Sequence, residues 1–376
     1  MNMTIVSVKS KSDMNKFIKL PWEIYKNDKN WVPPLIKNLK KNLNKATNSS
    51  LENIDFILYL VLSDRKPVGR ILTGIDNNLN KKKTSKIGYF SLLETINDYE
   101  VFKLLMDTSI KWLKDKNITL IKGPVSPNGI WGDEYKGLLI DDFQNPPVLM
   151  NSYNPSYYKD FIEKYGFYKD YDLYAYYMDA SLVFKKNPAK VIDYAKKKYN
   201  FYVESLDTKN IEKEIRDLKY IADKAIPEDW TDLVPPSLDD IKKLAKDLLP
   251  IADPDLIIIA RSENEPIGFG LALPDYNQVL KHLNGKLTPI SIIKYFWYKT
   301  KIKNIRFFIM LVIPEFRKKG VSYAIYYQTF LNAIKKGYIS GEGSTIGETN
   351  ISMRNDIESF GGKHYKTYRI YKKEIT

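Results

Sequence analysis

Apolar residues along this chain form short runs separated by polar turns, and one arrangement of them occurs twice. Residues 56–76 (FILYLVLSDRKPVGRILTGID) predict two strands around a polar turn at residues 63–67. Residues 255–275 (DLIIIARSENEPIGFGLALPD) predict a second hairpin of the same kind, with its turn at residues 262–266. The tripeptides Pro-Val-Gly at 67–69 and Pro-Ile-Gly at 266–268 correspond at an offset of 199 residues. The chain therefore contains an internal repeat.

The repeat also includes the segment that closes each half. Gly166 matches Gly361, and each glycine precedes a tyrosine-rich segment, which predicts a half-buried terminal strand because Tyr is common in strands. These tyrosines are Tyr171, Tyr174 and Tyr177 in the first half and Tyr365, Tyr368 and Tyr371 in the second. Each half thus reads as strands with intervening helices, which predicts a mixed α/β sheet.

The repeat sets the expected domain boundaries. A chain of 376 residues is long for one core, so two domains are expected. We predict a first unit over residues 1–180, a connecting helix within residues 181–200 (AKVIDYAKKKY), and a second unit over residues 201–376.

Composition narrows the chemistry. The chain has no Cys, which excludes disulfides and thiolate catalysis, and its two His are too few for a multi-histidine metal centre, so no metal is expected. Its net charge is +14, but few of its 59 cationic residues are Arg, and we read them as a solvated Lys-rich surface without a nucleic-acid partner. No apolar run approaches the roughly 20 residues that span a bilayer. We expect a cytoplasmic protein with no membrane partner, and the sequence does not indicate its oligomeric state.

A turn in the second half carries the strongest chemical signal. An apolar run over residues 305–313 predicts a strand, residues 323–336 predict a helix, and Arg317-Lys318-Lys319-Gly320 lie between them. The free backbone N–H groups at the start of a helix carry partial positive charge and bind anions, most simply a phosphate. Gly320 permits unusual φ values, and Ser322 is small enough for a ligand to approach the backbone.

These segments resemble a known family. The hairpin EPIGFGLAL, the strand and turn IMLVIPEFRKKGVS and the late segment ETNISMRNDIESFGG follow the order found in GCN5-related N-acetyltransferases (GNATs). The turn is similar to the R/Q-x-x-G-x-G/A acyl-CoA signature of that family, with Ser322 in place of the final Gly or Ala. The resemblance implies an α/β fold of two tandem acyl-CoA N-acyltransferase (GNAT-like) units, each a mixed, mostly antiparallel sheet flanked by helices. In the first half SLLETINDYE stands where the turn would be, without a glycine, so we expect a degenerate unit without a pyrophosphate loop.

The resemblance also implies a set of acyl-CoA-binding residues. The backbone of the strand that precedes the turn would pair with the pantetheine arm, and the turn would hold the pyrophosphate. Asn350 stands where the family often places a pantetheine-binding asparagine, although a helix N-cap is an equally good reading of it. The expected acyl-CoA-binding residues are Met310, Leu311, Val312, Arg317, Lys318, Lys319, Gly320, Val321, Ser322 and Asn350.

The catalytic residues are harder to select. Glu348 ends a predicted strand beside the expected cleft and is the candidate general base, with Glu342, expected near a turn, as the alternative. The family often has a tyrosine seven residues after the asparagine as general acid, and here Ile357 occupies that place. For the acceptor, one hypothesis is that the long segment over residues 122–150 packs toward the second unit and helps form a pocket; a lid that stabilises its own domain is an equally good reading. The carboxylates available in this segment are Asp133, Glu134, Asp141 and Asp142.

The predicted function is an acetyl-CoA-dependent N-acetyltransferase that moves an acetyl group to a small amine or amino compound. Two alternatives stay open. One is a non-catalytic acyl-CoA-binding protein, which would explain the missing tyrosine. The other is a transferase that uses aminoacyl-tRNA as donor, because that class also pairs two such folds.

Overall fold

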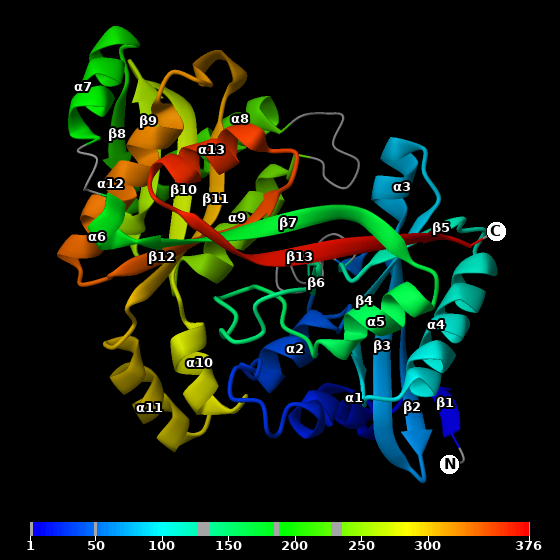
Figure 1. Ribbon diagram of the computed structural model, residues 1–376. Helices are drawn as coiled ribbons and strands as arrows, with labels where there is room; N and C mark the ends of the chain where they lie inside the picture. Colours follow the sequence, from blue (N-terminus) through cyan, green and yellow to red (C-terminus); the bar gives the residue numbers. More distant parts are fainter. Residues whose placement is uncertain (1–2, 49–50, 127–135, 184–187, 227–234, 376) are drawn as a thin grey trace. The chain divides into compact units, whose positions relative to one another are not determined.

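The computed structural model describes residues 3–48, 51–126, 136–183, 188–226 and 235–375 (Figure 1). The chain divides into two compact units. The first unit comprises Met1–Tyr174, Asn277–Thr300 and Lys366–Thr376, and the second comprises Ala175–Tyr276 and Lys301–Tyr365. Both units are therefore built from separated stretches of the sequence.

The first unit is a mixed sheet with helices on both faces. Its strands follow the order β1-β2-β3-β4-β5-β13, and all neighbouring pairs except the parallel pair β4–β5 are antiparallel. One core lies beneath α4 and α5, and a second lies beneath α1 and α2. The strands are β1 (Met3–Ser7), β2 (Ile54–Ser63), β3 (Lys66–Asp76), β4 (Ile87–Thr95), β5 (Leu120–Gly123), β6 (Leu138–Leu139) and β13 (Lys363–Glu374). The helices are α1 (Lys11–Ile24), α2 (Ile36–Asn42), α3 (Asn77–Lys83), α4 (Tyr99–Lys114), α5 (Tyr157–Lys164), α10 (Asn277–Leu283) and α11 (Pro289–Lys299).

The second unit repeats this plan. Its strands follow the order β7-β12-β11-β10-β9-β8, and the described pairs are antiparallel except β11–β12. The strands are β7 (Tyr168–Asp179), β8 (Tyr202–Ser205), β9 (Ile257–Ser262), β10 (Glu265–Pro274), β11 (Asn304–Val312) and β12 (Ser340–Gly347). The helices are α6 (Ala180–Val183), α7 (Ala189–Lys198), α8 (Ile211–Ala225), α9 (Leu238–Leu248), α12 (Val321–Lys335) and α13 (Ile351–Ser359), with 3₁₀ turns at η2 (Thr208–Asn210), η3 (Pro254–Leu256) and η4 (Pro314–Phe316). The predicted α/β fold of mostly antiparallel sheets is confirmed.

The two tyrosine-rich closing strands differ from the rest because each begins in one unit and ends in the other. The end of β13 pairs with β5, with Tyr371 opposite Gly123, although β13 belongs to the second repeat. Arg369 of β13 also forms an ion pair with Asp172 of β7, with Nε 2.8 Å from Oδ1. The unit boundaries defined by contacts therefore differ from the contiguous boundaries that the repeat predicts. The reason is that each closing strand is divided between the two units.

The strand β10 sets the position of helix α12. A Cβ atom at Gly270 would lie 2.4 Å from Cγ2 of Ile325, and one at Gly268 would lie 3.1 Å from Cγ1 of Val321. Only glycine allows the helix to approach the strand so closely. This contact places the start of α12 beside the end of β11.

No described helix is both long enough and apolar enough to cross a lipid bilayer.

Candidate acyl-CoA site

The site begins where β11 separates from β12. The described pairing of these two strands runs from Asn304 opposite Ser340 to Phe307 opposite Gly343. On its other side β11 stays paired with β10 as far as Val312, which lies opposite Gly268. The register with β10 shifts between Leu271 and Ala272, which leaves Phe308 as an extra residue. Such a bulge bends a strand, so β11 turns away from β12 and opens a gap.

The alternation of the β10–β11 ladder decides which backbone groups face this gap. The N–H of Ile313 donates to the carbonyl of Ile267 at 3.0 Å, so Ile313 and Leu311 point toward β10. Met310 and Val312 consequently direct their N–H and C=O groups toward the gap. Of the three strand residues expected to pair with a ligand through their backbone, Met310 and Val312 have the required direction, whereas Leu311 contributes its side chain.

The turn after β11 presents a helix N-terminus to the same space. Lys318 and Gly320 have φ values of +60° and +81°, and α12 begins at Val321. The N–H of Ala324 donates to the carbonyl of Gly320 at 2.9 Å and makes the first turn of the helix. The N–H groups that precede Ala324 have no carbonyl available within the helix. They form a partially positive end suited to an anion.

Arg317 holds this turn in place. Its Nε donates to the carbonyl of Val312 at 3.2 Å, and its Nη2 donates to the carbonyl of Ala225 at 2.7 Å. Ala225 is the last residue of α8, so the guanidinium joins the end of β11 to the end of that helix. The charge of Arg317 therefore lies beside the turn, and its Nε and Nη2 are both bonded to backbone carbonyls.

Ser322 has an acidic partner. Its Oγ donates to Oδ2 of Asp356 on α13 at 2.6 Å. Burial raises the pKa of the Asp356 carboxyl, and the hydrogen bond from Ser322 opposes part of that shift. The sequence does not predict an acidic side chain so close to the start of α12.

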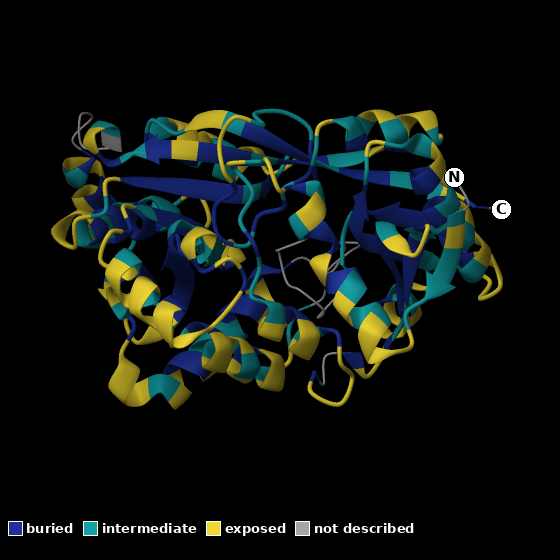
Figure 2. Cartoon of the chain, turned by 90° about the horizontal axis from the view of Figure 1, so that it is seen from below, coloured by how far each residue is buried: buried dark blue, intermediate teal, exposed yellow. Residues whose placement is uncertain are grey.

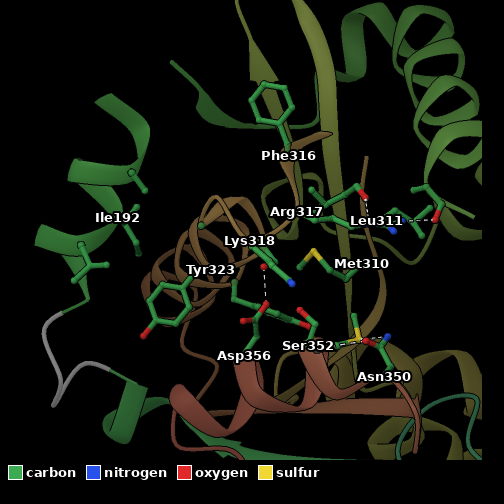
Figure 3. Close-up of a pocket in the computed structure, with 18 of the residues that line it drawn as sticks. Ile192, Met310, Leu311, Phe316, Arg317, Lys318, Tyr323, Asn350, Ser352 and Asp356 are labelled. Atoms are coloured by element: carbon green, nitrogen blue, oxygen red, sulfur yellow. Dashed lines mark hydrogen bonds between the residues drawn. The ribbon is translucent and has the colours of Figure 1, made fainter. Parts of the chain in front are cut away.

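These elements enclose a cavity of about 680 Å³ (Figure 3). The side chains of Met310, Lys318 and Asp356 lie around the same space. The cavity is lined by Val191, Ile192, Ala195, Ala225, Met310, Leu311, Val312, Phe316, Arg317, Lys318, Gly320, Ser322, Tyr323, Tyr326, Thr349, Asn350, Ser352, Met353 and Asp356. Two expected residues are not part of this lining. Val321 is buried against β10, and the Lys319 ammonium lies 4.9 Å from the centre of the Phe316 ring.

Of the two candidate site residues that follow β12, Asn350 lines the cavity and Glu348 does not. Asn350 is the N-cap of α13, because its Oδ1 accepts from the N–H of Met353 at 3.2 Å, and it also lines the cavity. Glu348 directly follows β12 without lining the cavity, and its carbonyl accepts from Nη1 of Arg354 at 2.8 Å. The base role predicted for Glu348 stays a prediction.

The alternative acid Glu342 was expected near a turn, and this was wrong. It lies inside β12, is buried, and accepts a hydrogen bond from the hydroxyl of Tyr365. The flanking glycines serve packing instead, since a Cβ at Gly343 would lie 2.9 Å from Cδ1 of Ile357. Ile357 itself is a core residue, so no hydroxyl is available at its position.

Several lining residues were missed by sequence reasoning. Tyr323 and Tyr326 lie three residues apart on α12, and this spacing places them on one face of the helix. The helix α7, which was interpreted as a connection, contributes Ile192 and Ala195. The spacing of the tyrosines was a usable signal, whereas nothing local to α7 indicated a cavity.

The acceptor pocket expected from residues 122–150 is only partly within the described residues. Asp133 and Glu134 lie outside them. Asp141 accepts from the N–H of Thr367 at 2.5 Å, and Asp142 accepts from Nδ2 of Asn145 at 2.9 Å, all within the first unit. Their predicted role toward a cationic amine stays a prediction.

Two known proteins are similar in sequence to this chain over nearly its whole length. No protein-family model matches the sequence. The chain is 28% identical over 375 residues to "Protein YghO" of Escherichia coli, covering 97% of this chain and 94% of that protein. It is 27% identical over 390 residues to the "Bacterial ceramide synthase" of Caulobacter vibrioides, covering 100% of this chain and 98% of that protein.

Solved structures share the fold over nearly the whole chain. A tandem GNAT protein from the clavulanic acid biosynthesis pathway has a TM-score of 0.59 at 9% identity, covering 100% of this chain and 99% of that one. A GCN5-related N-acetyltransferase from Sphaerobacter thermophilus has a TM-score of 0.55 at 10% identity, covering 99% and 96%. The chain has the tandem GNAT fold.

The first GNAT unit has the same strand separation without the turn. Its β4–β5 pairing ends at Tyr89 opposite Lys122, while β4 remains paired with β3 as far as Thr95. The N–H of Ile96 donates to the carbonyl of Val68 at 3.0 Å, as Ile313 does to Ile267 in the second unit. Thr95 is therefore the counterpart of Val312.

In the first unit two tyrosine side chains bond to the backbone of Thr95, whose counterpart Val312 faces the cavity in the second unit. The N–H of Thr95 donates to the hydroxyl of Tyr158 at 2.7 Å, and the carbonyl of Thr95 accepts from the hydroxyl of Tyr157 at 2.7 Å. Only residues 96–98 connect β4 to α4, whose N-cap Asp98 accepts from the N–H of Glu100 at 2.9 Å. The start of this helix is thus already satisfied by an acidic side chain.

Proposed function

We propose that the chain is an acyl-CoA-dependent N-acyltransferase with one acyl-CoA site, located in the second unit. The observation that carries the proposal is the direction of the Val312 N–H. It faces a gap between strands that leads to an anion-binding turn, whereas its counterpart Thr95 is bonded to Tyr158. The tandem fold supports the same conclusion.

The proposed binding mode follows from the polarity of the cavity. The N–H groups at the start of α12, with Lys318 beside them, would bind the pyrophosphate of CoA. The pantetheine arm would lie along β11 and pair with Met310 and Val312 as an added strand. One of these N–H groups would then polarise the thioester carbonyl where negative charge develops.

The reaction is the transfer of an acyl group from sulfur to nitrogen. The lone pair of a neutral amine attacks the thioester carbon, a C–N bond forms, the C–S bond breaks, and CoA leaves as a thiolate. The amine loses one proton, and we propose Glu348 as its acceptor, directly or through a water, with Glu342 as the alternative. A thiol has a pKa of ~8.5, so the thiolate can leave without the tyrosine that Ile357 replaces.

The identity of donor and acceptor forms a finer proposal. Acetyl-CoA and a small amine are the pair that the family resemblance implies. A second candidate is the transfer of a longer acyl chain to a long-chain amino alcohol. The similarity to a ceramide synthase over nearly all of both chains favours it, because a ceramide is the amide of a fatty acid with such an alcohol. Apolar lining residues such as Ile192, Leu311 and Met353 suit either pantetheine or an acyl chain.

Two measurements test the proposal. Isothermal titration with acetyl-CoA, palmitoyl-CoA and free CoA should detect one site per chain. A thiol-release assay should then compare both acyl donors on small amines and on long-chain amino alcohols. Failure to bind any CoA compound contradicts the proposal. Binding without thiol release on any acceptor would instead identify a non-catalytic acyl-CoA-binding protein, and acceptance of aminoacyl-tRNA as donor would identify the third class.

A further inference from the structure

The helix α11 exposes an unusual number of large apolar side chains. Between 49% and 70% of each of these side chains is exposed to solvent. They are Ile290, Ile292, Ile293, Phe296 and Trp297, and Leu287 just before the helix is also exposed. The only buried residue of the helix is Ser291. Soluble proteins seldom expose so much apolar surface in one place without a partner for it.

These side chains form one continuous face. With about 100° of rotation per residue, Ile290, Ile293 and Trp297 lie along one line of the helix, and Ile292 and Phe296 lie beside it. The apolar face therefore covers roughly 160° of the helix circumference. Lys294 borders it on one edge and Lys299 on the other. Figure 2 colours the chain by burial, with exposed residues in yellow.

The charged residues of the chain segment that contains this face have a single sign. The segment from Leu283 to Lys303 contains no Asp or Glu. Its cations are Lys286, Lys294, Lys299, Lys301 and Lys303. An apolar helical face edged by lysines and containing Trp and Phe is the composition of helices that lie in a membrane interface.

The helix is mounted on the first unit by the turn that precedes it. The Nε1 of Trp22 donates to Oδ1 of Asn284 at 2.7 Å, and the N–H of Ile36 donates to the carbonyl of Gly285 at 3.0 Å. Gly285 has a φ of +73°, and a Cβ there would lie 2.4 Å from Trp22. The turn is thus held closely against α1 and the start of α2, while the apolar face of α11 remains exposed.

We propose that α11 docks onto an anionic phospholipid bilayer. The apolar face would enter the boundary between head groups and acyl chains, and the lysines would contact lipid phosphates. A helix of 11 residues is about 16 Å long and cannot cross a hydrocarbon core of about 30 Å, so it lies in the interface. The lysines favour lipid over a second copy of the chain, since two such faces would bring like charges together. This inference departs from the expectation of no membrane partner and is independent of the proposed acyltransfer.

Vesicle flotation of the full chain tests this proposal. We expect the protein to float with vesicles of phosphatidylglycerol and phosphatidylcholine, and to stay in solution with pure phosphatidylcholine or at high salt. The double variant Ile293→Glu/Phe296→Glu should reduce the bound fraction at least tenfold. The variant Ile339→Glu is the matched control, because Ile339 is 60% exposed and belongs to the second unit. It should float like the wild type.

A charge-reversal variant separates the two contributions. Lys294→Glu/Lys299→Glu keeps the apolar face and should weaken flotation on anionic vesicles severalfold. The proposal is overturned if the wild type does not float, or if Ile293→Glu/Phe296→Glu floats undiminished. It is also overturned if gel filtration finds a dimer that this variant dissociates, because the face would then bind a second copy. Thiol release with soluble substrates should be unchanged in all variants, and circular dichroism checks that each is folded.

Discussion

The hydroxyl of Tyr158 accepts a 2.7 Å hydrogen bond from the backbone N–H of Thr95. Thr95 occupies in the first unit the place that Val312 has in the second, at the end of a strand that has left its neighbour. One N–H is thus satisfied within the protein, and the other faces a cavity. The Tyr158 side chain is thus one of the differences between the two copies of the repeat, beside the shorter turn of the first.

Replacing Tyr158 with Phe should destabilise the first unit without creating a second CoA site. The hydroxyl also donates to Oε2 of Glu94 at 2.9 Å, and the side chain is buried, so its loss leaves polar groups unsatisfied. We expect a loss of ~1–3 kcal/mol in the free energy of unfolding, measured by urea denaturation. Tyr168→Phe is the control, because that hydroxyl is exposed and bonds to Glu374 at the surface. An equal loss in both variants would contradict the interpretation.

The free energy of unfolding should depend on pH because of the titration of Glu94. Burial raises the pKa of Glu94 to about 7, against the lowering effects of Arg70 and of hydrogen bonds from Tyr25 and Tyr158. Folding therefore takes up a proton at pH values between the unfolded pKa of ~4.3 and the folded pKa. The stabilisation is complete below this window and is lost as the pH rises through about 7, by ~3–4 kcal/mol in all.

The variant Glu94→Gln isolates this contribution. Gln keeps the shape and an acceptor oxygen for the two tyrosines but does not titrate. Urea unfolding of both proteins from pH 5 to pH 8 should show wild-type stability falling relative to the variant. A difference that does not change with pH would mean that Glu94 titrates at its ordinary value.

Placing a carboxylate at the turn should abolish acyl-CoA binding. In Gly320→Glu a negative side chain stands at the start of α12, and a non-glycine residue must adopt the φ of +81°, which costs ~1–2 kcal/mol in stability. Gly337→Glu is the matched control, since Gly337 has a φ of +85° and nothing within 4 Å of an added Cβ. Titration calorimetry should show at least a tenfold loss of CoA affinity for the first variant only. Equal affinities would refute the site.

Arg317→Lys separates geometry from charge. Lysine keeps the cation, but one ammonium cannot replace both hydrogen bonds of the guanidinium, to Val312 and to Ala225. We expect CoA affinity to fall about tenfold, a ~1.4 kcal/mol effect. Lys318→Gln, which removes a charge without such bonds, serves for comparison. If Arg317→Lys binds CoA normally, the charge of Arg317 is what matters.

Asp356→Asn should strengthen CoA binding at alkaline pH. The amide can still accept the hydrogen bond from Ser322, while a negative charge beside the anion site is removed, worth ~1 kcal/mol or about fivefold in affinity. Burial raises the pKa of Asp356, so the wild type should approach the variant as the pH falls and the carboxyl becomes neutral. Calorimetry between pH 5.5 and pH 8 measures this, with Asp247→Asn on the surface of α9 as control. Weaker binding by the variant would show that the carboxylate supports the turn.

Local sequence patterns predicted the strands and the helix around the site, but not which side chains contact one another there. The apolar runs, the glycines and the spacing of the turn located β10, β11 and the start of α12, because strand alternation and a left-handed glycine are properties of a few consecutive residues. Glu342 was misplaced because flanking glycines are typical of turns, whereas here they make room for neighbouring side chains within a strand. The cavity walls contributed by α7 had no local signal.

The sequence by itself determined that the chain is a repeat of two α/β units and that one copy has a cationic, glycine-containing turn at the start of a helix. Only the tertiary structure decided that the closing strands are divided between the units, that Ser322 meets Asp356, and that Tyr158 fills the gap at Thr95. These relationships join residues far apart in the chain. They depend on how strands and helices pack, and the residue pattern within a single segment does not predict that packing.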